Sequence, residues 1–167
     1  MKPTERPILD LLYSPQDLAL EVAAVGGILL NLGLFGLFWP RLPAVVPTHF
    51  GVSGRPDAWG DKSTILILPA ASLTLYFMLT IVSRYPHKFN YLWPITAQNA
   101  AEQYRLARSL LAWLKVEMIA LFGFLEWTTI RTALKQGEGP GFLFLPVVLG
   151  LIFGTLGIYF YFAYRNR

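Results

Sequence analysis

The sequence contains no cysteine, which excludes disulfide bonds, thiolate metal sites and a cysteine nucleophile. Charge is also scarce, because only 14% of the 167 residues are charged, too few for an ordinary soluble domain of this size. Hydrophobic residues make up 54% of the chain and are concentrated in long runs. This composition predicts an integral membrane protein embedded in a lipid bilayer.

Other classes of site are poorly represented as well. The 14 Lys and Arg residues are dispersed among the connections, with no basic tract, so we expect no binding to nucleic acid. Only two histidines are present, whereas a metal site needs three or more ligands, so we expect neither a metal nor a cofactor. The N-terminal residues mix acids with bases and precede no small-residue cleavage site, so we expect no cleaved signal peptide.

Four apolar segments predict an all-α fold of four transmembrane helices in a single membrane domain. The spans cover about residues 18–39, 65–82, 110–130 and 142–164. Ser14, followed by Pro15 and Asp17, is a typical helix start. The third helix lacks a breaker for about forty residues, or about 60 Å, which is twice the hydrocarbon thickness. We therefore expect a connection and polar stalk, residues 83–109, to project from the bilayer.

The distribution of cations predicts the orientation. With four spans, both termini lie on one side. Eight Lys and Arg residues fall on the termini and the second connection: Lys2, Arg6, Arg84, Lys88, Arg105, Arg108, Arg165 and Arg167. Five fall on the first and third connections: Arg41, Arg55, Lys62, Arg131 and Lys135. The bias favours cytoplasmic termini, with the loop of residues 40–62 outside.

The loop between the first two spans, LPAVVPTHFGVSGRPDAWGDK, is the most motif-like segment. Its prolines and glycines exclude a regular helix and predict an ordered series of turns. We identify five candidate side chains for recognition of a ligand or partner: His49, Phe50, Asp57, Trp59 and Lys62.

Four of these loop residues also have a structural interpretation. His49 and Asp57 with Ser53 lack the context of a hydrolytic triad, which favours a hydrogen-bonded His49 within the turns over catalysis. Asp57 and Lys62 fit a turn and a helix cap. Trp59 fits an anchor at the membrane interface as well as a partner contact.

Polar residues inside the predicted spans form a second candidate group. Asn31, Thr74 and Glu117 lie within apolar segments, where an ionisable residue is a functional hypothesis by default. We expect Glu117 to face the bundle and bond a hydroxyl or amide, or to be protonated. Lys115 is close enough to the inner interface to snorkel. Glu21 and Glu126 lie near helix ends, where we assign them no role.

Small residues predict where helices approach closely. Gly150 and Gly154 form a GxxxG pair, extended by Gly157, and Gly27 lies between Ala23 and Asn31 on the first helix. Packing within one bundle is the favoured interpretation, and assembly into a homo-oligomer is the alternative.

Two segments carry a family resemblance. Residues 42–69, LPAVVPTHFGVSGRPDAWGDKSTILILP, resemble the bacterial membrane domain of unknown function at the N-terminus of SdpI-like immunity proteins. Residues 84–115, RYPHKFNYLWPITAQNAAEQYRLARSLLAWLK, are similar to the short four-span members of that family, although Trp93 departs from their pattern. The resemblance implies a helical inner-membrane protein with an outward HF loop. For the larger relatives it implies immunity to a secreted toxic peptide and sequestration of a repressor, whereas this chain lacks their C-terminal part.

These observations favour a non-enzymatic protein that senses or neutralises a peptide or envelope ligand through the loop. Two alternatives stay open at this point. The glycine stripes fit an accessory subunit of a larger membrane complex, and Glu117 fits a small transporter.

Overall fold

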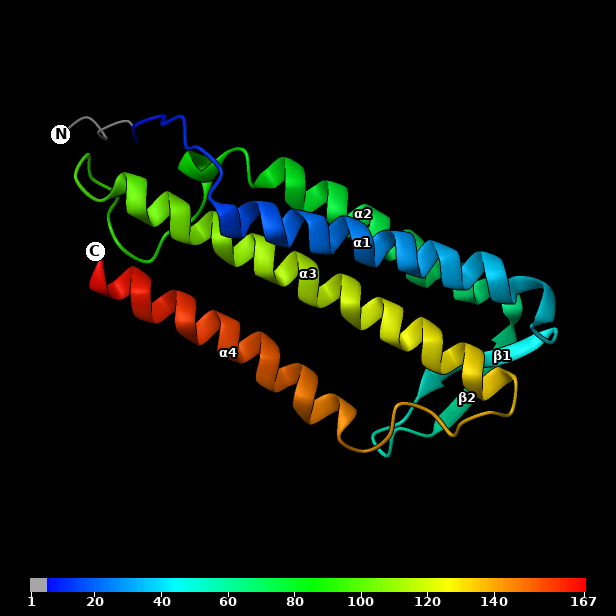
Figure 1. The fold of residues 1–167 in the computed structure, drawn as a ribbon. Coiled ribbons are helices and arrows are strands. Elements are labelled where there is room, and N and C mark those ends of the chain that lie inside the picture. Colours follow the sequence, from blue (N-terminus) through cyan, green and yellow to red (C-terminus); the bar gives the residue numbers. More distant parts are fainter. Residues whose placement is uncertain (1–5) are drawn as a thin grey trace.

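The structure is a computed structural model that describes residues 6–167, and these residues form four helices and one short hairpin (Figure 1). The helices are α1 (Pro15–Phe38), α2 (Ile67–Val82), α3 (Ala100–Ala133) and α4 (Phe144–Arg165). Short 3-10 turns lie at Trp39–Arg41, Lys62–Leu66 and Pro86–Lys88. The predicted order of four helices, with a long third one, is confirmed.

The loop between α1 and α2 is ordered, as expected, but its turns join two strands. Strand β1 (Val45–Phe50) pairs antiparallel with β2 (Pro56–Asp61), so that Val45 lies opposite Asp61 and Pro47 opposite Trp59. The register shifts on either side of His49, where the ladder is irregular. A bulge of this kind bends a strand and re-aims its side chains.

Three helical segments are long and apolar enough to cross a membrane. They are Pro15–Arg41, Lys62–Val82 and Phe144–Arg165, with mean hydropathies of 2.0, 2.2 and 1.9. The protein is therefore a multi-pass membrane protein. Helix α3 falls outside this group because Lys115, Glu117 and Glu126 interrupt its apolar sequence. It runs alongside the other three helices (Figure 1), which supports its predicted crossing.

Helix α3 is the centre of the packing. Helices α1 and α2 lie on one side of it and α4 on the other (Figure 1). Ile119 packs with Ala24 and Ile28 in one apolar cluster. Near the hairpin, Ile130 packs with Val46 and Ile65 in a second. These clusters hold α1, α2 and the hairpin against a single face of α3.

The helix ends follow local chemistry. At the start of α1, the Ser14 hydroxyl accepts from the Asp17 backbone N–H at 3.1 Å, and the Asp17 carboxylate accepts from the Ser14 N–H at 2.8 Å. This capping box confirms the predicted helix start. Helix α3 has 34 residues, or about 51 Å, shorter than the forty expected but longer than a hydrocarbon core.

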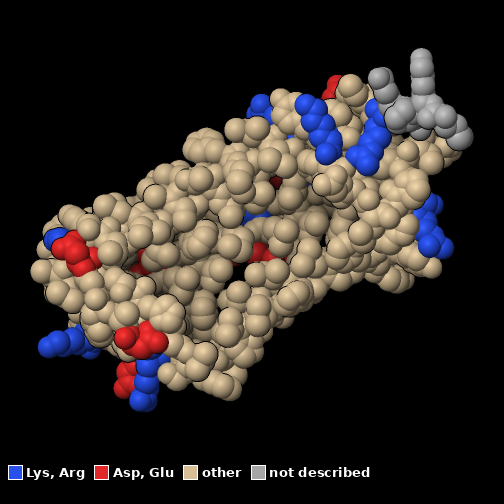
Figure 2. Space-filling view, turned by 180° about the vertical axis from the view of Figure 1, so that it is seen from behind, with Lys and Arg blue, Asp and Glu red and all other residues tan. Residues whose placement is uncertain are grey.

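Both described ends of the chain lie at one end of the bundle, and the hairpin lies at the other (Figure 1). We call these the terminal end and the hairpin end. Lys and Arg side chains gather near the two ends of the face seen in Figure 2, whose long middle is mostly uncharged. This distribution is typical of a bundle whose middle lies in hydrocarbon.

Candidate functional site

The hairpin packs closely against the backbone of the connection between α3 and α4. Gly54 has a φ of 73°, and a Cβ there would lie 2.3 to 2.5 Å from the backbone of Gly141. A Cβ on Gly139 would lie 2.1 Å from the Gly54 carbonyl oxygen and 3.0 Å from the Phe50 ring. Only glycine fits such positions, so these glycines fix the turn of the hairpin in place.

His49 and Asp57 face each other across the two strands. His49 Nδ1 lies 2.5 Å from Asp57 Oδ1, and the two side chains are 67% and 53% exposed. When Nδ1 carries the hydrogen, it donates to the Asp57 carboxylate, and Nε2 is available to a ligand. The predicted hydrogen bond of His49 within the loop is therefore confirmed, while the pair stays open to solvent.

The remaining loop candidates separate into two groups. The half-buried Phe50 lines two neighbouring hollows of about 250 and 370 Å³, and the second of these also borders His49. Trp59 is 53% exposed on β2. Lys62 instead lies 4.5 Å from the centre of the Trp39 ring, at the start of the chain's return to the membrane. Phe50 thus shares a hollow with His49, whereas Lys62 is in a packing contact.

Two further polar contacts hold the hairpin region. Arg55 Nη2 lies 3.3 Å from Glu138 Oε2, which ties the hairpin turn to the α3–α4 connection on the surface. Asp61 accepts from the Ser63 backbone N–H at 2.8 Å, and this bond lowers the pKa of the Asp61 carboxyl. Asp61 therefore caps the 3-10 turn Lys62–Leu66, which leads into α2.

Asn31 is buried in the middle of the bundle. Its Nδ2 donates to Ser72 Oγ at 3.0 Å and to the Ile119 carbonyl at 3.3 Å, and a Cβ on Gly123 would lie 2.2 Å from its Oδ1. Asn31 therefore links α1, α2 and α3 by hydrogen bonds. Thr74 is separate from this cluster, because it is exposed and donates to the Ala70 carbonyl of its own helix.

Glu117 contacts α4. Thr155 Oγ1 donates to Glu117 Oε1 at 2.5 Å, which confirms the expected bond to a neighbouring hydroxyl. Glu117 Oε2 is buried and has no hydrogen-bond partner among the described residues. Glu117 also lines the hollows on both sides of this contact between α3 and α4.

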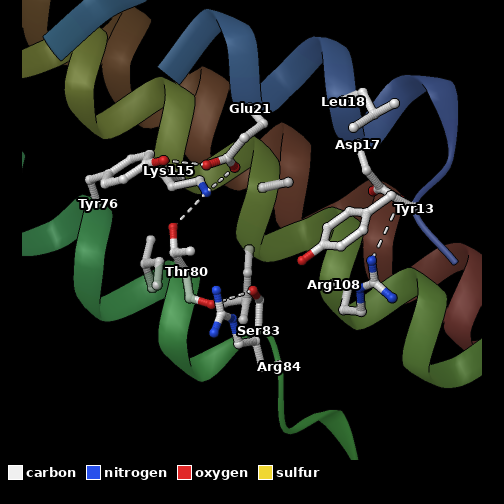
Figure 3. A pocket seen from close by; sticks show the side chains of 13 residues that line it. Tyr13, Asp17, Leu18, Glu21, Tyr76, Thr80, Ser83, Arg84, Arg108 and Lys115 are labelled. Atoms are coloured by element: carbon white, nitrogen blue, oxygen red, sulfur yellow. Dashed lines mark hydrogen bonds and ion pairs between the residues drawn. The ribbon is translucent and has the colours of Figure 1, made fainter. Parts of the chain in front are cut away.

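The expectation that Lys115 snorkels to the inner interface is wrong. Lys115 is only 4% exposed and does not snorkel: its Nζ lies 2.5 Å from Glu21 Oε2 and 2.9 Å from Thr80 Oγ1. Tyr76 donates its hydroxyl hydrogen to the other Glu21 oxygen at 2.5 Å. Glu21, to which the sequence assigned no role, is thus the centre of a polar cluster that joins three helices (Figure 3).

The Glu21–Lys115 cluster forms one wall of a hollow of about 340 Å³ near the terminal end of the bundle (Figure 3). Arg108 lies on another wall, where its Nη1 donates to the Leu11 carbonyl at 2.8 Å and its guanidinium covers the Tyr13 ring at 4.4 Å. Arg84 also borders this hollow. We refer to it as the terminal-end pocket.

Glu126 was also missed from sequence. It is completely buried, and neither carboxylate oxygen has a hydrogen-bond partner within residues 6–167. It shares the inward face of α3 with Gly123 and Ile130. Its spacing from Ile119 and Ile130 indicated that face, but its place near a predicted span end suggested exposure. In the described part of the chain, no group of three His, Asp or Glu residues is arranged to hold a metal ion.

The predicted packing glycines behave differently from one another. A Cβ on Gly27 would lie 2.8 Å from Ile119 Cγ2, which confirms close packing of α1 on α3. For Gly150 and Gly154, no described atom lies within 4 Å of such a Cβ. Their packing inside the bundle, which the sequence favoured, is therefore not observed, because this stripe of α4 faces outward. Assembly with another copy or protein stays a prediction for these glycines.

Comparison with known proteins identifies relatives of this sequence. Residues 26–73, from the middle of α1 through the hairpin into α2, match the model described as a domain of unknown function, DUF1648. The chain is 32% identical over 152 residues to an uncharacterized protein of Archaeoglobus fulgidus, with 78% of this chain and 82% of that protein covered. No solved structure matches the chain. The chain therefore contains a DUF1648 domain and belongs to one family with this archaeal protein.

Proposed function

We propose that the protein is a non-enzymatic binding protein whose hairpin recognises a peptide or envelope ligand on the outer side of the membrane. The observation that carries this proposal is the exposed His49–Asp57 pair on a hairpin held by glycine contacts and an ion pair. A binding group that is already fixed loses little conformational entropy when a ligand arrives.

The surroundings of the pair favour a peptide-like ligand. One of the two hollows beside Phe50 also borders His49 and is lined mainly by apolar residues, and Trp59 supplies an exposed aromatic surface. Among the described residues, β2 pairs only with β1, so its other edge can accept an extended peptide through main-chain hydrogen bonds. The resemblance of the loop to SdpI-like immunity proteins supports the same class of ligand.

Site-specific photocrosslinking tests the proposal in the native membrane. A photoreactive phenylalanine analogue in place of Trp59 should give a discrete adduct, and the same analogue in place of Tyr85, near the opposite end, should not. His49→Ala and Asp57→Asn should abolish the Trp59 adduct without lowering the amount of protein in the membrane. An adduct that survives both substitutions would contradict the proposal, and a matching loss of protein would make the pair structural.

A second candidate function is that of an accessory subunit in a larger membrane complex. It is favoured by Gly150 and Gly154, which face outward on α4. The most apolar stretch of this helix contains no buried residue. Small residues on a lipid-facing helix allow another helix to approach closely. Extraction in mild detergent should then recover a stoichiometric partner that is lost on Gly154→Leu but kept on Ile158→Leu. A second copy of this chain as the partner would indicate a homo-oligomer instead.

A further inference from the structure

The terminal-end pocket lies near the ends of two candidate membrane spans, Pro15–Arg41 and Lys62–Val82. It is bordered by the start of α1, the end of α2 and the part of α3 in which the predicted stalk ends (Figure 3). The chain has an excess of cations at this end, and Figure 2 shows several of them there. The hollow of about 340 Å³ is large enough for a small polar group such as a phosphate diester.

Arg108 has hydrogen-bonding capacity that the protein does not use. Its side chain is only 10% exposed, and its Nη2 is buried without a hydrogen-bond partner among the described residues. The Asp17 carboxylate lies 3.9 Å away, too far for a hydrogen bond, and its Oδ2 already accepts from the Ser14 N–H. A buried guanidinium N–H without an acceptor is costly, so an additional acceptor in the pocket would be stabilising.

The charge inside the pocket selects an anion. Glu21 neutralises Lys115 at 2.5 Å, which leaves Arg84 and Arg108 against Asp17. Two guanidinium groups on different elements can hold the oxygens of one phosphate by charge-assisted hydrogen bonds. The balance of charge in this pocket is therefore positive before a ligand binds.

The flank of the pocket favours a lipid over a soluble anion. Leu18 lines the pocket and is 57% exposed, and Val22, one turn further along α1, is 73% exposed. This surface runs from the pocket into the apolar region of the bundle, where acyl chains would lie. We propose that the terminal-end pocket binds the phosphate of an anionic phospholipid through Arg108 and Arg84. The proposal goes beyond ligand recognition by the hairpin and does not depend on it.

The test uses the full chain, purified in detergent and reconstituted with phosphatidylglycerol or phosphatidylcholine, with bound lipid counted by native mass spectrometry. The wild-type protein should retain phosphatidylglycerol selectively. Arg84→Gln should weaken retention about tenfold, as expected for loss of one charge-assisted hydrogen bond, and Arg108→Gln should weaken it at least as much. Arg105→Gln is the matched control, because Arg105 is exposed on the same helix and pairs with Glu102.

Several outcomes would overturn the proposal. Equal loss in Arg105→Gln would show a diffuse attraction to surface charge, and unchanged retention in Arg84→Gln and Arg108→Gln would show that the pocket holds no lipid. Arg108→Gln also removes the bond to Leu11, so Arg84→Gln separates loss of binding from loss of folding. A separate titration with inorganic phosphate covers the soluble alternative: thermal stabilisation equal to that by phosphatidylglycerol would assign the pocket to a free anion.

Discussion

At the residue scale, the ion pair between Glu21 and Lys115 joins a buried lysine to a carboxylate that is 36% exposed. The Lys115 side chain is 5% exposed and has two oxygen partners, so its charge is balanced within the protein. Removing one member of a buried pair strands the other, whereas replacing both by apolar groups is often tolerated. Glu21 and Lys115 are therefore expected to behave as a unit.

We therefore expect the effects of substitutions at Glu21 and Lys115 on the free energy of unfolding to be strongly non-additive. Glu21→Gln leaves the buried Lys115 without its carboxylate and should lower the free energy of unfolding by about 3 kcal/mol. Lys115→Met should lower it by less, because Glu21 is 36% exposed, and the double variant should lose less than the sum of the two. Unfolding in detergent by calibrated denaturant titration measures this. Lys88→Met, at an exposed lysine near the same end, should change stability little. Additive losses would show that the two charges do not interact.

Asp61 predicts a pH dependence at the start of the second helical segment. Its folded-state pKa is lowered by the Ser63 N–H, so the stabilisation is present above the unfolded pKa of about 3.9 and is lost as the pH falls through the lower, folded value. Hydrogen exchange at the Ser63 amide should accelerate over this range in the wild-type protein. In Asp61→Asn, the exchange rate of the Ser63 amide, corrected for its intrinsic pH dependence, should not change over the same pH range. A protection that persists unchanged at low pH in the wild-type protein would contradict this assignment.

Sequence and structure agree at the residue scale where the signal comes from residues close by in the sequence. Ser14, Asn31 and Glu117 occupy the environments that their neighbours in the sequence indicate. The Glu21–Lys115 contact joins residues 94 positions apart, and the rotation of two helices that brings them together has no local signal. Glu126 was missed for the same reason, because its burial depends on how α3 faces α1 and α2.

At the element scale, the hairpin shows how glycine chemistry positions a candidate site. Gly54 combines a left-handed φ with backbone contact to Gly141, so the hairpin turn and the α3–α4 connection form one unit. The proposed recognition pair depends on this unit for its orientation. The ion pair between Arg55 and Glu138 reinforces the same contact from the surface.

Gly54→Ala should loosen the hairpin without unfolding the helices. A Cβ would be strained at this φ and would overlap Gly141, at a cost of about 1–3 kcal/mol. Limited proteolysis should then cleave residues 50–57 faster than in the wild-type protein. Gly26→Ala is the matched control, because no described atom lies within 4 Å of its Cβ position. Equal protection of both variants would mean that the turn is not fixed by this contact.

The helices were more predictable than the hairpin for a physical reason. Long apolar runs and the Ser14 cap are local signals, and the helix bounds follow them closely. The strands are six residues each and carry two prolines, which mark turns as readily as strand positions. Their pairing, and the outward face of Gly150 and Gly154, depend on neighbours that are distant in the sequence.

At the scale of the whole molecule, we expect the hairpin and the described chain ends on opposite sides of the membrane. The helices support this arrangement, because the hairpin and the chain ends lie at opposite ends of the bundle (Figure 1). Recognition of an outside ligand further requires that the hairpin side be the outer one. The bias of Lys and Arg toward the terminal end predicts that orientation.

Cysteine labelling tests this central claim most directly, because the natural chain has no cysteine to interfere. Single cysteines would be introduced as Trp59→Cys on the exposed part of β2 and as Asn166→Cys after α4, and intact cells would be treated with a membrane-impermeant maleimide. We predict that Trp59→Cys is labelled in intact cells and that Asn166→Cys is labelled only after permeabilisation. The reverse pattern would place the hairpin in the cytoplasm and would contradict its role as an outer recognition element.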